Sequence, residues 1–91
     1  MKLRWSDIAL SDLTKIADYL FDRTPQHTDR IVLTVYESPN VLLQFPLLGR
    51  VGRKTGTREL ALTPLPYILV YRVNGQMIHV VRVLHGAQKY P

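Results

Sequence analysis

The chain has no cysteine among its 91 residues, so its fold contains no disulfide bond and no thiolate metal site. This absence suits a reducing compartment. The sequence also lacks an apolar run of the roughly 18 to 20 residues that a membrane-spanning helix needs. Its N-terminus does not combine a basic start with an apolar stretch, as a secretion signal would. We therefore expect a soluble, cytoplasmic protein with no membrane partner.

Acidic residues are scarce in the second half of the chain. Residues 1–45 hold five lysines and arginines and six acidic residues, whereas residues 46–91 hold seven lysines and arginines and a single acidic residue, Glu59. The formal charges of the two halves are therefore −1 and +6. So basic a half indicates an acidic partner, either a nucleic acid or an acidic protein segment. The alternative is a charged surface that only keeps the protein in solution.

Residues that could hold a metal or a nucleotide are also few. His27, His79 and His85 are scattered along the chain, and their spacing does not predict a metal site. Residues 46–56, PLLGRVGRKTG, contain three glycines and three basic residues. They lack the Gly-Lys-Thr ending of a phosphate-binding loop, and no strand precedes them. We expect no cofactor and no metal. The segment is either a basic loop that contacts a polyanion or a plain connection.

The first half of the chain has the pattern of two helices. Residues 1–5 are a short strand candidate, and Ser6 is a good N-cap for a helix of about four turns. That helix should end before Pro25, which suits the first position of a second helix running to Phe45. Pro39 lies inside the second helix, where it removes a backbone hydrogen bond. We therefore expect a kink or a break near this proline.

The second half has the pattern of three antiparallel strands, expected over residues 57–62, 67–73 and 77–84. Asn74-Gly75, between the last two strands, predicts a tight type I′ turn. The element order is therefore β-α-α-β-β-β in a single domain of residues 1–91. This order predicts a two-layer α+β fold, with a helical hairpin packed on one face of an antiparallel sheet and the opposite face open.

Alternation along the predicted strands concerns two arginines in particular. Alternation puts Arg58 on the same face as Leu60 and Arg82 on the same face as Val80, and both guanidinium groups could project onto the open face. A guanidinium group is always charged and can bind two oxygens of one phosphate. Glu59 alternates to the face opposite Arg58, which makes it a poor general base for a site there. The shortage of carboxylates counts against an enzyme.

Several short motifs follow one another along the chain. They are Phe45-Pro46, Gly49-Arg50, Gly56 to Leu60 (GTREL), Pro66 to Tyr71 (PYILVY) and Arg82 to Gln88 (RVLHGAQ), and they follow an amphipathic opening helix with Trp5 just ahead of it. In this order and spacing the motifs resemble the RelE/ParE family of bacterial toxins, the toxin halves of type II toxin–antitoxin modules. The resemblance covers essentially the whole chain.

The resemblance implies a small cytoplasmic toxin that is neutralised by an antitoxin encoded beside it. A disordered acidic segment of the antitoxin wraps the toxin, and the complex binds operator DNA through the antitoxin. Two target classes are implied. RelE-like members enter the ribosomal A site and cleave mRNA, whereas ParE-like members inhibit DNA gyrase and are not nucleases.

The resemblance also implies roles for single residues. Arg58, Arg82 and His85 match places where ribonuclease members keep catalytic residues; the arginines would stabilise phosphate charge and the histidine would act as a general acid. Residues that could bind RNA or another target are Arg50, Arg53, Lys54, Lys89 and Tyr90. ParE-like members have a histidine at the place of His85 that catalyses nothing, and the lysine pair of RelE has no clear counterpart.

Three functions are therefore open at the level of sequence. The first is a ribosome-dependent mRNA interferase that uses Arg58, Arg82 and His85. The alternative is a non-enzymatic inhibitor of DNA gyrase, favoured by the lack of an acid–base pair and by the sequence HGAQ at residues 85–88. The third is a basic binding module without toxicity.

Overall fold

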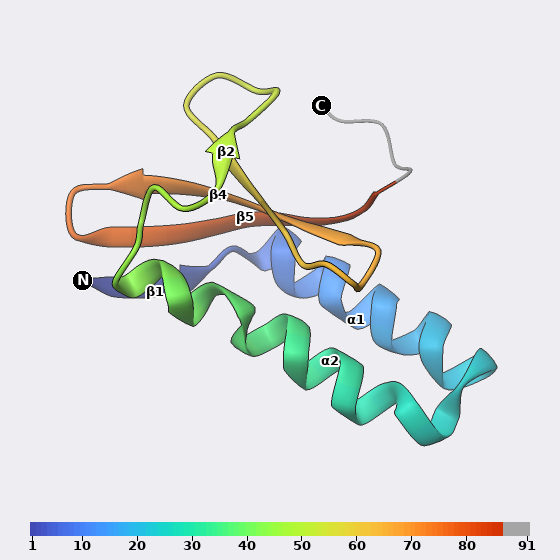
Figure 1. The fold of residues 1–91 in the computed structure, drawn as a ribbon. Coiled ribbons are helices and arrows are strands. Elements are labelled where there is room, and N and C mark those ends of the chain that lie inside the picture. The colour runs from blue at the N-terminus through green and yellow to red at the C-terminus, as the bar shows by residue number, and fades with distance from the viewer. Residues whose placement is uncertain (87–91) are drawn as a thin grey trace.

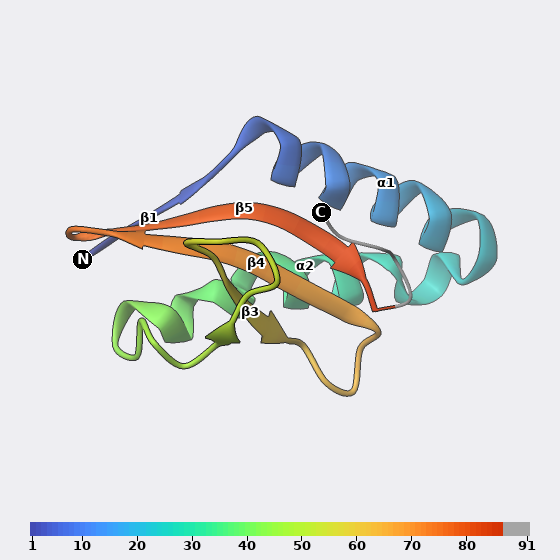
Figure 2. The ribbon, with the colours of Figure 1, turned by 90° about the horizontal axis from the view of Figure 1, so that it is seen from above.

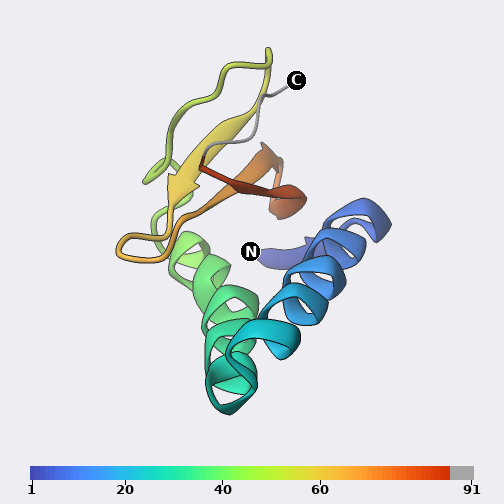
Figure 3. The ribbon, with the colours of Figure 1, turned by 90° about the vertical axis from the view of Figure 1, so that its right-hand side faces the viewer.

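The computed structural model describes residues 1–86, so the predicted target-binding residues Lys89 and Tyr90 lie outside the described residues. Its elements, in chain order, are β1 Lys2–Trp5, α1 Asp7–Arg23, the 3₁₀ helix η1 Pro25–His27, α2 Thr28–Glu37, the 3₁₀ helix η2 Ser38–Leu43, β2 Arg50–Val51, β3 Arg58–Ala61, β4 Tyr67–Asn74 and β5 Met77–His85 (Figure 1). Both α-helices lie on the same side of the sheet (Figure 3). The predicted α+β fold with a helical hairpin on one face is confirmed.

The opening helix begins as the sequence predicts. The Ser6 hydroxyl accepts a hydrogen bond from the Ala9 N–H at 3.0 Å, which satisfies one of the donors that the first turn leaves without a partner. Asp7 sits in the first turn and Arg23 in the last, so both charges complement the helix dipole. Ala9 and Leu13 are buried and fix the face that α1 turns to the sheet.

The predicted break at Pro39 is confirmed. α2 ends at Glu37, and the chain continues as the 3₁₀ helix η2. Proline has no N–H and would crowd the carbonyl one turn earlier, that of Val35. The Ser38 hydroxyl donates to this carbonyl at 2.7 Å, so the interruption leaves it bonded. The new direction of the chain buries both Pro39 and Leu42.

The sheet has five strands in the order β1-β5-β4-β3-β2. Neighbouring strands are antiparallel except for β1 and β5, which run parallel from Lys2 beside Met77 to Trp5 beside Val80. The sheet is therefore mixed rather than wholly antiparallel. β2, only two residues long, forms within the segment that the sequence predicts as irregular, where Arg50 pairs with Glu59. It leaves a very short strand at that edge of the sheet.

The hairpin between β4 and β5 differs from the prediction by one residue. Asn74 is the last residue of β4 and pairs with Met77, so Gly75 and Gln76 form the two-residue turn. Gly75 has a φ of +61°, and within residues 1–86 no residue other than glycine has a positive φ. Type I′ needs positive φ at both central residues, whereas type II′ needs it only at the first. The predicted type I′ turn is therefore wrong, and the turn has the pattern of type II′.

A bulge reverses the faces of β5 halfway along the strand. Val70 pairs with Arg82 and Tyr71 with Val80, so β5 contains one extra residue, Val81. Before the bulge Val80 points into the core, and after it Val83 does. The expectation that Arg82 shares a face with Val80 is therefore wrong, because strict alternation fails where two residues oppose one.

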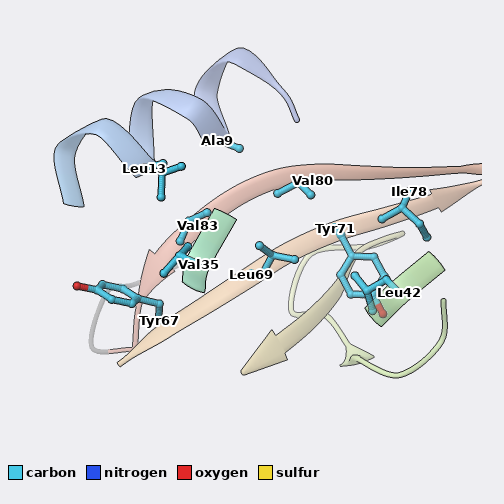
Figure 4. Packing of buried hydrophobic residues seen from close by; sticks show 10 residues of the cluster. All are labelled: Ala9, Leu13, Val35, Leu42, Tyr67, Leu69, Tyr71, Ile78, Val80 and Val83. Carbon is cyan, nitrogen blue, oxygen red and sulfur yellow. The ribbon is translucent and has the colours of Figure 1, made fainter. Parts of the chain in front are cut away.

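The core fills the space between the helices and the sheet (Figure 4). Figure 4 shows Ala9 and Leu13 of α1 pointing toward β5. Tyr71, on β4, is completely buried and has its hydroxyl in two hydrogen bonds. The hydroxyl accepts from the Gly49 N–H at 2.9 Å and donates to the Pro46 carbonyl at 2.7 Å. Burial raises the pKa of Tyr71, which keeps the hydroxyl protonated and able to donate. It therefore fastens the segment between η2 and β2 to the centre of the sheet.

Replacing Tyr71 by phenylalanine is expected to lower the free energy of unfolding by about 2 kcal/mol, because it leaves the Gly49 N–H and the Pro46 carbonyl without their partner. Chemical denaturation followed by circular dichroism measures the change. Tyr36→Phe is the matched control, since Tyr36 is exposed and keeps its ring stacked on Trp5. Equal stability of the two variants would contradict the assigned role of the Tyr71 hydroxyl.

Candidate functional site

Arg82 lies at the edge of β5 and binds a carboxylate of α1. Its Nε donates to Asp12 Oδ2 at 2.8 Å and its Nη2 donates to Oδ1 at 3.1 Å, a two-pronged ion pair. The Val83 N–H also donates to Asp12 Oδ2, at 2.9 Å. The Asp12 side chain is 9% exposed and that of Arg82 28%. A single buried carboxylate thus holds both a strand edge and an arginine.

The position of Asp12 follows from the end of β1. β1 stops pairing with β5 at Trp5, and α1 then runs beside the rest of β5 (Figure 2). The Ser6 N–H and hydroxyl bond the carbonyls of Val80 and Val81 at the point of change. Farther along, the Asp12 carboxylate accepts the N–H that a strand partner would otherwise have taken. The helix therefore closes the edge that β1 leaves open.

A groove of about 570 Å³ opens beside this ion pair, between the helical hairpin and the end of the sheet. Its rim includes Lys15 and Tyr19 of α1, Tyr67 of β4, and Arg82 and His85 of β5. The rings of Tyr67 and His85 meet edge to face with centroids 6.1 Å apart. Burial raises the pKa of Tyr67, and the nearby Tyr19 hydroxyl adds to the increase. The groove therefore combines an apolar floor with the cationic side chains of Lys15 and Arg82 and with two tyrosine rings.

Arg58 is not part of this groove. It pairs with Tyr71 along the sheet, and its Nη1 donates to the Gly49 carbonyl at 2.8 Å. β4 lies between its strand and β5, and Arg82 pairs on a different row with Val70. Arg82 and His85 therefore come together at the groove. Arg58 shares the core side of the sheet with Tyr71, whereas Arg82 shares the opposite side with Val70. The expected position of Arg58 on the open face is therefore wrong, and so is the shared face of the two arginines. Whether any of these three residues is catalytic stays a prediction.

Glu59 is the buried centre of a second charged cluster. Its side chain is 1% exposed and accepts from Arg50 Nη2 at 3.0 Å, from Arg53 Nε at 3.1 Å and from the Arg53 N–H at 2.9 Å. Burial alone would raise the pKa of Glu59, but the bonds from Arg53 and Arg50 outweigh it and hold the pKa below its ordinary value. As predicted, Glu59 points away from the face of Arg58. Its two arginines are held in place while much of each guanidinium side chain faces solvent.

The loop between β2 and β3 carries Lys54 at its exposed tip. The Thr57 hydroxyl and N–H both bond the Lys54 carbonyl, and the Gly52 N–H bonds the Thr57 carbonyl. From β4, Arg72 Nη1 donates to the Thr55 carbonyl at 3.2 Å. These bonds tie the loop to the sheet. A role of Arg50, Arg53 and Lys54 in binding a target stays a prediction.

Sequence reasoning missed Asp12 as the partner of Arg82. Asp12 falls next to Leu13 on the inward side of α1, and an acidic residue at an inward position needs a cationic or N–H partner when it is buried. The inward position of Asp12 on the predicted helix was therefore the one sign in the sequence that it has a partner. Nothing local in the sequence identifies the partner, because it lies 70 residues away.

Within residues 1–86, no group of three or more histidine, cysteine, aspartate or glutamate residues could hold a metal ion. No helix in the same range is long and apolar enough to span a bilayer.

Comparisons with known proteins agree with this fold and with these motifs. Residues 3–90 match the family model described as the ParE toxin of the type II toxin–antitoxin system parDE. The chain is 33% identical to protein Y4kP of Sinorhizobium fredii over 90 residues, which cover 99% of this chain and 93% of that protein. It is 36% identical to toxin RelE2 of Caulobacter vibrioides over 84 residues, which cover 92% and 93% of the two chains.

Solved structures show the same likeness. A chain of the chromosomal ParDE toxin–antitoxin system of P. aeruginosa superposes with a TM-score of 0.87 at 28% identity, over 93% of this chain and 95% of that one. A YoeB/ParE toxin of Agrobacterium tumefaciens shares the fold, with a TM-score of 0.61 at 22% identity, over 93% and 98% of the two chains. The chain therefore belongs to the RelE/ParE family and is the toxin of a type II toxin–antitoxin system.

Proposed function

We propose that this toxin acts by binding its target without cleaving it, and that the target is DNA gyrase. The separation of the predicted catalytic residues carries the proposal. Cleavage of RNA needs an acid, a base and a phosphate-binding group within hydrogen-bond reach of one reacting centre. Arg58 bonds the Gly49 carbonyl, Arg82 is held by Asp12, and these two arginines lie on different sides of β4. A ParE-like mode of action needs no such assembly.

The surface proposed to contact gyrase is the rim of the groove at the end of β5. His85 is exposed there, and it is the last residue of β5. Lys15 and Tyr19 lie across the groove from the sheet. The Asp12–Arg82 pair fixes the strand end beneath this surface, so we assign Arg82 a positioning role. Lys89 and Tyr90 lie outside the described residues, and their role in binding a target stays a prediction.

Purified toxin is expected to inhibit ATP-dependent supercoiling of relaxed plasmid by purified gyrase. His85→Ala should weaken inhibition roughly tenfold, the loss of about 1.4 kcal/mol typical of one important contact residue. His27→Ala is the matched control, because His27 is an exposed histidine on η1 at the far end of the helical hairpin. Full supercoiling at a large excess of folded wild-type toxin would refute gyrase as the target.

A second candidate is a ribosome-dependent mRNA interferase, and one observation favours it. Arg82 and His85 line the same groove as Lys15, so three nitrogen-bearing side chains surround one opening. Primer extension on translated mRNA after toxin induction tests this activity. Cuts within the coding frame, together with normal gyrase activity, would replace the first proposal by the second. Intact transcripts at a toxic dose would exclude the second.

Family membership implies a cognate antitoxin as partner. We propose that it neutralises the toxin in the cytoplasm, where gyrase and ribosomes both work. Its acidic segment would compete for the cationic rim of the groove, and sequence-specific contacts to operator DNA would come from the antitoxin.

A further inference from the structure

The face of the sheet without helices carries a row of basic side chains that the proposed function does not use. Arg4 of β1 pairs with His79 of β5, and His79 pairs with Arg72 of β4, so the three residues stand side by side across neighbouring strands. Ile78 and Val80, on either side of His79, are buried in the core beneath the helices. By alternation the row Arg4–His79–Arg72 therefore points away from the helices.

The row continues onto the loop between β2 and β3. Arg72 bonds the Thr55 carbonyl of that loop, whose exposed tip carries Arg53 and Lys54. Arg50, at the start of β2, points to the same side because it pairs with Glu59 through its side chain. Lys2 extends the row at the other edge, two residues before Arg4 on β1. The basic face, as we call it, consists of Lys2, Arg4, Arg50, Arg53, Lys54, Arg72 and His79.

The basic face has almost no compensating negative charge. Within the described residues its one carboxylate is Glu59, which is buried and already bonded to Arg50 and Arg53. The chain's other acidic residues all lie on the two helices, at Asp7, Asp12, Asp18, Asp22, Asp29 and Glu37. The protein is therefore strongly polarised, with acidic helices on one side of the sheet and a cationic surface on the other.

The basic face also lacks the apolar anchors of a protein interface. Protein partners are held mainly by buried aromatic and aliphatic side chains. The large exposed apolar residues of this chain lie mostly on the helices and in residues 41–51. Val51 and Val73, exposed residues within strands, alternate with the residues of the basic face and point to the other side. Cations without apolar anchors suit a partner that offers charge alone.

We propose that the basic face binds the sugar–phosphate backbone of a nucleic acid, without reading its sequence. Phosphates repeat along such a backbone, and arginines spread over several strands and a loop can contact more than one of them. Fixed guanidinium groups lose less freedom on binding, and the bond of Arg72 to the Thr55 carbonyl of the loop and that of Arg53 to the Glu59 carboxylate provide that order. This inference goes beyond the proposed function and does not depend on it, because it uses neither the groove nor His85.

Fluorescence anisotropy with the full-length toxin tests the proposal, using a 20-base-pair DNA duplex and an RNA strand of about the same length, and both probes are chosen only for their backbone. Binding should weaken steeply with salt. Arg4→Glu combined with Arg72→Glu should weaken binding at least tenfold and lower the slope of log K against log salt by about two, the number of phosphate contacts removed. Binding of either probe supports the proposal, and their ratio identifies DNA or RNA as the natural partner.

The control is Arg23→Glu combined with Arg30→Glu, which changes the net charge equally but on the helices, where both residues are exposed. It should bind within about twofold of wild type. If both double variants lost the same affinity for the probes, net charge alone would explain binding and the proposal would be overturned. A wild type that binds neither probe would also overturn it. If Arg4→Glu with Arg72→Glu fails to fold, Arg4→Gln with Lys54→Gln, both at exposed positions, provides the same comparison.

Discussion

Replacing Asp12 by alanine is expected to lower the free energy of unfolding by about 3 kcal/mol, one of the largest effects of any single substitution in this chain. The change removes three hydrogen bonds at once, two from Arg82 and one from the Val83 N–H. Breaking a buried ion pair by removing one partner typically costs about 3–5 kcal/mol. The Arg82 side chain is 28% exposed, so water can solvate its charge once Asp12 is gone. We therefore expect a cost at the lower end of this range.

Urea denaturation of the purified toxin measures this effect. Asp18→Ala is the matched control, since it removes an exposed carboxylate from the same helix and should change stability by no more than about 0.5 kcal/mol. Asp12→Ala combined with Arg82→Met should cost less than the sum of the two single changes, because the double variant leaves no charge without its partner. If Asp12→Ala were as stable as Asp18→Ala, the role of α1 in closing the edge of β5 would be wrong.

Replacing Glu59 by glutamine is expected to destabilise the fold by about 2 kcal/mol near pH 7. The neutral amide would face the guanidinium groups of Arg50 and Arg53 and would lose both ion pairs. The cost stays below the range for fully buried pairs because those arginine side chains are 69% and 41% exposed. The exchange of the Arg53 N–H with solvent deuterium should also quicken, since this amide donates to the Glu59 carboxylate.

The sign of the pH dependence follows from the lowered pKa of Glu59. Because the pKa in the folded protein lies below the ordinary value of 4.5, the ionised carboxylate contributes its full stability above pH 4.5. That contribution is lost as the pH falls through the lower, folded-state pKa. The difference in stability between wild type and Glu59→Gln should therefore be large at pH 7 and shrink toward pH 3. Glu37→Gln, at an exposed position on α2, should show little difference at either pH. A gap that stays constant between pH 7 and pH 3 would contradict the role of the ionised carboxylate.

The parts of this fold that follow from the sequence depend on neighbouring residues. Ser6 caps α1 because its hydroxyl needs only an N–H three residues away, and Pro39 interrupts the second helix through its own missing N–H. The two long strands β4 and β5 were also predictable, since both are rich in apolar β-formers. In each case a few adjacent residues contain the whole cause.

The candidate site depends instead on contacts between residues that are far apart in the sequence, and the sequence predicts such contacts less well. The bulge at Val81 arises from how β4 and β5 are paired, and it turns Arg82 away from the face that alternation assigns to it. Asp12 and Arg82 meet across 70 residues of sequence, and nothing near either residue indicates the other. A single inserted residue therefore places Arg82 on the face opposite Arg58, although each arginine lies in a strand that the sequence predicts.

The position of β5 has a consequence for how the toxin is made. This strand lies between β1 and β4, so β1 finds its neighbour only when residues 77–80 have been synthesised. Domains acquire their structure as the chain emerges, N-terminal segments first, yet here the early segments lack the surface on which they would settle. A nascent chain that stops before Met77 would lack the partner of β1, and its groove would lack Arg82, Val83 and His85. A chain truncated before Met77 is therefore expected to lack toxicity.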